Sequence, residues 1–117
     1  MSVCTPDTVE QAVSHVLVSV DAAGNISCQP AELDVSGSNV LIVFALAARD
    51  WVFPDSGAIV VANGGTQFPI PAWTINNKQA ALLDCDTAAG TFSYTVTVQH
   101  TSSGQRKSLD PTIKNQP

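Results

Sequence analysis

The stretch that decides the fold class is GTFSYTVTVQHTSSGQRKSLDPTIKN, which runs from Gly90 to Asn115. Thr and Val alternate along Thr91–Val98, a loop rich in Ser and Gly follows, and a shorter run covers Arg106–Ile113. Successive side chains of a strand point to opposite faces, so this alternation indicates a strand with one buried face. Two such runs joined by a turn predict a β-hairpin. This part of the chain therefore predicts an all-β fold.

Earlier segments show the same kind of pattern. Apolar and polar residues alternate along Ser14–Val20, and a turn with Gly and Asn leads back through Ile26–Gln29 as a second hairpin. Before it, Asp7 and Glu10 have capping-box spacing, which predicts at most one helical turn. The run Val40–Leu46 is apolar on both faces, and its β-branched residues favour a central strand over a buried helix.

Length and composition limit the architecture further. The chain has 117 residues, of which 44% are apolar and only 13% are charged. This is enough for one domain, residues 1–117, to fold on its own hydrophobic core. Short strands separated by turn signals at roughly ten-residue spacing are typical of sandwiches. We therefore expect a single antiparallel β-sandwich of about seven or eight strands.

The charge balance bears on possible partners and location. The formal net charge of −5 would repel nucleic-acid phosphates, so we expect no nucleic-acid partner. The basic residues Arg106, Lys107 and Lys114 fit a solvated strand end, where Asp110 partly offsets them. No Lys or Arg precedes Arg49, and no apolar signal segment is visible. The longest apolar run is about half a membrane span, so we expect a soluble, cytoplasmic protein without a membrane partner.

The cysteines give a related expectation. Cys4, Cys28 and Cys85 are odd in number and none has C-x-x-C spacing. Without an export signal, we expect three reduced thiols and no zinc or redox motif.

Two segments resemble the cupredoxin-like β-sandwiches. The first is Pro30–Phe44, an extended segment followed by a Gly turn and an apolar strand; the second is Ala89–Tyr94, with the pattern Gly-Thr-aromatic-x-aromatic. The resemblance implies Greek-key topology over nearly the whole chain. The end Ser108–Asn115 is also similar to small uncharacterised bacterial proteins of this organisation, which lack the copper ligands.

In the cupredoxin-like family, function rests on a copper site with an upstream His and a Cys, His and Met near the last hairpin loop. Here only His100 falls near that loop, Cys85 precedes the strand, and the only methionine is Met1. Thiolate, thioether and imidazole ligands are what copper prefers, so we expect no metal and no cofactor. The alternative is a redox carrier of unusual ligation that uses His100 and a cysteine.

Other chemistry has little support in the sequence. His15 and His100 are the only imidazoles, and no Gly-x-Ser-x-Gly elbow is present. We therefore expect no enzyme and no catalytic residue. Asp84-Cys-Asp-Thr87 carries two carboxylates that suit calcium, but without the Asp-x-Asp-x-Asp-Gly loop a polar turn is the favoured interpretation.

The aromatic side chains give the one candidate site. Trp51, Phe53, Phe68 and Trp73 lie in the middle of the chain among several prolines. They either fill the core or form a loop surface for a partner, because such residues dominate interface energetics. We expect a metal-free, non-catalytic binding or structural module that contacts a protein partner or its own copy. A phage-type or other assembly component would look the same.

Overall fold

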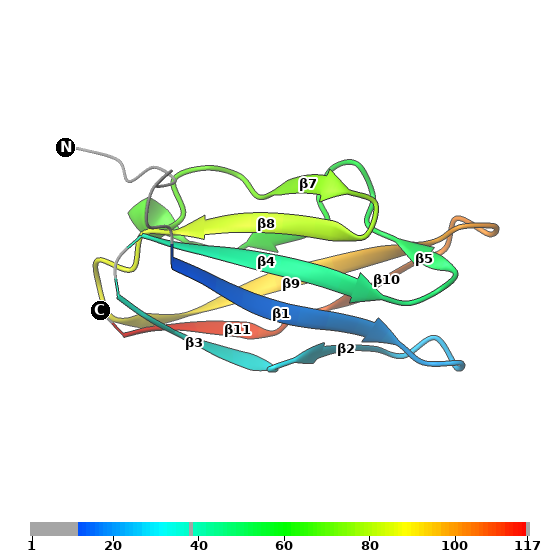
Figure 1. Ribbon diagram of the computed structural model, residues 1–117, viewed down its shortest axis with the longest axis horizontal. Helices are drawn as coiled ribbons and strands as arrows, with labels where there is room; N and C mark the ends of the chain where they lie inside the picture. Colours follow the sequence, from blue (N-terminus) through cyan, green and yellow to red (C-terminus); the bar gives the residue numbers. More distant parts are fainter. Residues whose placement is uncertain (1–11, 38, 117) are drawn as a thin grey trace.

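The computed structural model describes residues 12–37 and 39–116, and it shows two β-sheets packed face to face (Figure 1). The helical turn expected before Ser14 falls on residues outside this range, apart from its end. The strands are β1 (Ala12–Val20), β2 (Ile26–Gln29), β3 (Glu32–Ser36), β4 (Val40–Ala47), β5 (Trp51–Val52), β6 (Ile59–Val61), β7 (Trp73–Asn76), β8 (Gln79–Asp84), β9 (Gly90–His100), β10 (Arg106–Leu109) and β11 (Thr112–Gln116). A short 3-10 helix, η1, covers Gly65–Gln67.

The strand order confirms an all-β fold and corrects two details of the prediction. The first sheet has the order β2-β1-β4-β8-β7, and the second has the order β10-β9-β11-β3, with β5 and β6 also paired to β9. The described residues thus form eleven strands rather than seven or eight. Both sheets are mixed rather than antiparallel, because β1 runs parallel to β4 and β3 runs parallel to β11.

The parallel pairs arise where the chain changes sheets. β2 pairs with β1 in the first sheet, and after Pro30 and Ala31 the chain continues as β3 in the second sheet. Pro30 has no N–H to donate to a sheet ladder, which favours a break between strands at this point. β4 then returns to the first sheet in the opposite direction, which makes it parallel to β1 (Figure 1).

The core lies between the sheets. β4 has the central position predicted for it, between β1 and β8, and alternates buried and partly exposed residues. From the second sheet, β9 contributes Tyr94, Val96 and Val98, all buried. The Phe44 ring packs on the Tyr94 ring with centroids 5.4 Å apart, which joins the two layers at the centre.

The predicted C-terminal hairpin is confirmed, with one interruption. β10 pairs with the far end of β9 and β11 with its beginning. Asp110 and Pro111 separate the two return strands: the Thr95 hydroxyl donates to Asp110 at 2.7 Å, and the Tyr94 N–H donates to the Pro111 carbonyl at 3.0 Å. The interruption at Asp110 and Pro111 therefore stays hydrogen-bonded to β9.

This packing predicts unequal costs for two truncations. Phe44 is fully buried, so Phe44→Ala leaves a cavity and should lower the free energy of unfolding by about 3–5 kcal/mol. Thr101→Ala changes an exposed loop side chain and should stay within about 0.5 kcal/mol. Chemical denaturation of both variants measures the difference, and equal midpoints would contradict the core position of β4.

Candidate protein-binding site

The structure separates the four aromatic residues predicted to bind a partner. Trp51 and Phe53 lie in the core, with 9% and 2% of their surfaces exposed, and the Trp51 ring packs edge-on against His100. Phe68 is half-buried and packs against Phe92 at 5.2 Å between ring centroids. Trp73 is 37% exposed on β7. Only Phe68 and Trp73 thus lie where a partner can reach them, and partner binding itself stays a prediction.

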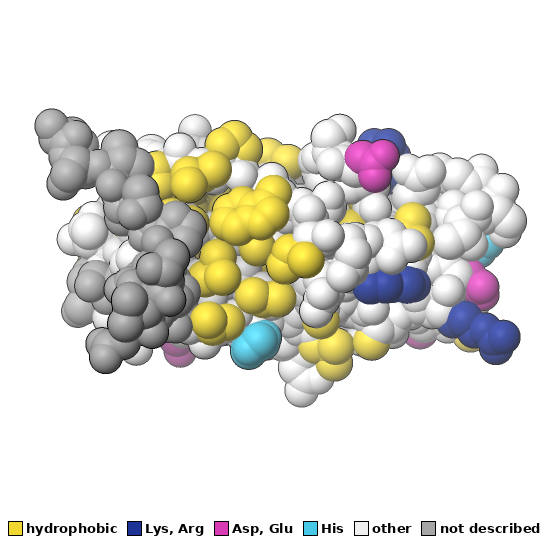
Figure 2. Space-filling view, turned by 45° about the horizontal axis from the view of Figure 1, so that its top comes forward, with side chains coloured by type: hydrophobic (Ala, Val, Ile, Leu, Met, Phe, Trp, Pro, Cys, Tyr) yellow, Lys and Arg dark blue, Asp and Glu magenta, His cyan; other side chains and the backbone are white. Residues whose placement is uncertain are grey.

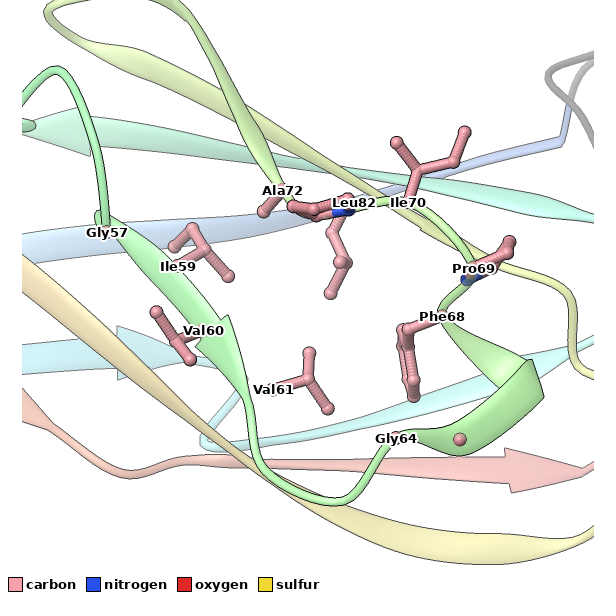
Figure 3. Close-up of a pocket in the computed structure, with 12 residues that line it drawn as sticks. Gly57, Ile59, Val60, Val61, Gly64, Phe68, Pro69, Ile70, Ala72 and Leu82 are labelled. Atoms are coloured by element: carbon pink, nitrogen blue, oxygen red, sulfur yellow. The ribbon is translucent and has the colours of Figure 1, made fainter.

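Phe68 lines an apolar groove, which also includes Ala72, the residue before Trp73 (Figure 3). Its volume is about 460 Å³, within the usual range for ligand sites. One wall is β6, the other is the segment 68–72, and Leu82 of β8 also faces the space. The remaining lining residues are glycines, so no charged side chain lines the groove. Because Leu82 is a core residue, the groove reaches the space between the sheets.

Local sequence explains why the groove stays open. After β6, the chain turns through Asn63, which has a positive φ of 55°. At Gly64 a Cβ atom would lie 2.7 Å from the Phe68 ring, so glycine lets that ring fold over the turn. Pro69 and Pro71 then lack N–H groups, which disfavours pairing of this segment with β6. The two walls therefore face each other without forming a sheet.

Among the strands of residues 12–37 and 39–116, none pairs with the edge of β6 that faces away from β9. Ala62 N–H donates to Ser93 and Thr97 N–H donates to Ala58, so Ala58, Val60 and Ala62 turn their backbone polar groups toward β9. Ile59 and Val61, which alternate with them, must turn theirs outward. Their side chains face the core and the groove, whereas the Val60 side chain is 53% exposed.

Exposed apolar side chains continue from the groove onto the first sheet. Figure 2 shows hydrophobic side chains gathered in one area of this face, with charged side chains mainly outside it. The large apolar side chains exposed among the described residues are Val13 and Leu17 on β1, Val60 on β6, and Trp73 and Ile75 on β7. We use the term apolar flank for the groove together with Val60, Trp73 and Ile75. Asp55 lies near its rim, beside Trp73.

A buried polar cluster lies at the opposite end of β8 from the β7–β8 turn. The Asn115 amide donates to Asp84 at 2.9 Å and to Gln67 at 3.2 Å, and the Asp86 N–H donates to the same Asp84 oxygen at 3.0 Å. The other Asp84 oxygen, both Asp86 carboxylate oxygens and the Asn115 carbonyl accept no hydrogen bond. The sequence predicted only a polar turn here, because alternation along β8 does not show how deep its last residue lies.

The pKa values of the buried Asp84 and Asp86 carboxyl groups are raised, which favours their neutral forms. Burial raises the pKa of Asp84 from 3.8 to about 6, and the nearby Asp86 charge adds to this rise. Burial also raises the pKa of Asp86, although the Gln116 N–H lies near enough to favour the carboxylate without forming a well-aligned hydrogen bond. Across residues 12–37 and 39–116, no group of three or more His, Cys, Asp or Glu is placed to hold a metal ion.

The raised pKa of Asp84 predicts a pH-dependent stability. The folded state keeps its proton up to about pH 6, whereas the unfolded chain loses it near 3.8. Stability from this group is therefore complete at low pH and lost as the pH rises to about 6, by roughly 3 kcal/mol. Asp84→Asn keeps an acceptor for Asn115 and should remove this loss. Urea unfolding of both proteins at pH 4.5 and 7.5 should measure about 2 kcal/mol of this loss, because the unfolded carboxyl is already mostly ionised at pH 4.5. Parallel pH profiles would contradict the buried carboxyl.

The cysteines differ from the expectation of three reduced thiols. Cys28 is a free thiol in the core, and burial raises its pKa to about 11. Cys85 is disulfide-bonded, so that expectation is wrong. Alternating strand patterns cannot show which cysteines meet in space, and an odd count permits one bridge.

This arrangement predicts one titratable thiol per chain. Protein unfolded in denaturant without reductant should react with one equivalent of a thiol reagent, and with three after reduction. Three equivalents before reduction would show that Cys85 is not oxidised. Cys28→Ser, in which the free thiol is absent, is the matched control and should give none before reduction.

The structure also places the residues of the alternative metal site. His100 lies at the end of β9, where its Nδ1 accepts the Ser103 N–H at 3.2 Å. Cys85 lies near the beginning of β9, because the adjacent Asp84 contacts Asn115, which pairs with Gly90. The length of β9 separates His100 from Cys85 by roughly 30 Å, so one ion cannot bind both.

No protein-family model matches the chain, and no curated protein matches its sequence. The described part of the chain contains no helix of the length and apolar character needed to cross a membrane.

Proposed function

We propose that this protein is a non-catalytic binding module that contacts another protein, or a second copy of itself, through the apolar flank. The observation that carries the proposal is an exposed tryptophan, Trp73, directly after an uncharged groove that opens toward the core. Tryptophan is enriched among the residues that dominate binding energy. Large exposed apolar patches are rare on monomeric proteins, and those with a polar rim commonly mark interaction sites.

The charge distribution supports an apolar contact. The net charge is −5, yet the groove has no charged lining residue and Asp55 lies only at the rim. Interfaces commonly combine an uncharged centre with a polar rim. Binding at such a surface depends little on ionic strength, since salt screens charges and does not weaken apolar contacts.

Three finer features belong to the proposal. The cupredoxin-like strand order is supported by the two packed sheets and the last hairpin. The alternative of a redox carrier that uses His100 and a cysteine is disfavoured for Cys85 by its distance from His100, and for Cys28 because burial raises the thiol pKa to about 11 and opposes the thiolate that binds a metal. The disulfide at Cys85 favours an oxidising compartment over the cytoplasm, because cytosolic thiols are kept reduced.

Site-specific photo-crosslinking tests the proposed function. The native protein, expressed in its own cells, carries a benzophenone amino acid in place of Trp73 or, as a control, in place of Lys114, which is exposed on the second sheet. We expect a discrete protein adduct from position 73 and none from position 114. Ile75→Asp should abolish that adduct, since it places a charge beside Trp73 on β7.

The mass of the adduct identifies its partner. Twice the mass of the chain indicates a second copy, and any other discrete mass indicates a different protein. No adduct from position 73, or the same adducts from both positions, would overturn the assignment of the contact to the apolar flank.

A further inference from the structure

We propose that the apolar flank binds its partner by strand addition: an extended peptide segment with alternating apolar side chains pairs with the free edge of β6 and fills the groove. This inference rests on the proposed function and names the chemistry of the partner segment. It follows from the backbone of β6 and from the lining of the groove, which are independent features.

The backbone of β6 supplies the hydrogen bonds. The N–H and C=O groups of Val60 face β9, whereas those of Ile59 and Val61 point to the open side. An extended peptide about 4.8 Å away would accept from both N–H groups and donate to both carbonyls. β6 has only three residues, so the added strand gains few main-chain bonds and its side chains must supply the rest.

The groove defines those side chains. Residues of the added strand that share the face of Ile59 and Val61 would point toward Phe68 and Leu82, into the volume of about 460 Å³. With no charged lining residue, the groove would leave an inserted charge unpaired, at high cost. Inserted residues are therefore apolar, whereas residues on the Val60 face are exposed and polar residues are accepted there.

The far wall limits where the peptide can pair. Pro69 and Pro71 carry no N–H, which disfavours the segment 68–72 as a second sheet edge for the peptide. The strand is thus hydrogen-bonded on the β6 side and packed by side chains on the other. This mode combines main-chain hydrogen bonds for affinity with pockets for alternate side chains.

The test uses seven-residue peptides selected from a random phage-displayed library against the whole protein. We expect selected sequences to alternate apolar and polar residues. On binding, amide hydrogen exchange measured by NMR should slow at least tenfold at Ile59 and Val61, because their N–H groups gain acceptors. The Val60 amide, already bonded to β9, should change little.

Two matched pairs separate backbone pairing from simple apolar binding. N-methylation of the peptide at positions that face β6 should weaken binding about tenfold, since each such position loses a hydrogen bond. Methylation at the alternate positions should have little effect. Ile70→Asp, in the groove wall, should abolish peptide binding, whereas Leu17→Asp, which changes an exposed apolar side chain of β1 outside the apolar flank, should not.

Val61→Pro adds a direct check, because it removes the outward N–H of Val61, which does not take part in the ladder between β6 and β9. It should weaken peptide binding about tenfold; the methylated peptides test the same bond if this variant does not fold. Failure to select any alternating peptide would overturn strand addition, as would binding without protection of Ile59 and Val61. In either case, a partner adduct from the crosslinker at position 73 would still support the proposed function. If position 73 gives no adduct, the proposed function itself is overturned.

Discussion

The second sheet depends on the backbone of β9. This eleven-residue strand pairs with β11 and β10 along one edge and with β6 and β5 along the other. Its inward side chains Tyr94, Val96 and Val98 also form the second sheet's part of the core, where Tyr94 meets Phe44 of the first sheet. Because buried backbone groups need partners, a break in β9 would leave β5, β6 and β10 without a ladder among the described strands and β11 paired only with β3.

Alternation made β9 predictable from the sequence because the strand is long, whereas β4 was predictable from a continuous apolar run rich in β-branched residues. The sheet change at Pro30 and the resulting parallel pairs were not predictable, because periodicity reports which face is buried and not which strand lies alongside. β5 and β6 are too short to show a pattern at all. Their positions follow from pairing with β9, which is a property of the tertiary structure.

The candidate site was predictable only in part. A surface near Phe68 and Trp73 followed from aromatic residues among prolines, and the same reasoning included Trp51 and Phe53, which fill the core. The groove joins β6, the segment 68–72 and Leu82, which are separated in sequence. Its one local signal was the pair of prolines, which indicates where pairing fails. The burial of Asp84 had no such signal, because it depends on Asn115 from the far end of the chain.

The edge strand β3 has a consequence for synthesis on the ribosome. Its strand partner is β11, and Thr112 and Glu32, which are joined by a hydrogen bond, lie 80 residues apart. A growing chain therefore carries β3 as an open edge until β11 has left the exit tunnel, although β1 and β2 can pair much earlier. Such unpaired edges invite association with other chains. The exposed charges of Glu32 and Asp34 on β3 oppose such association until β11 is available. Part of the negative net charge therefore protects the nascent chain.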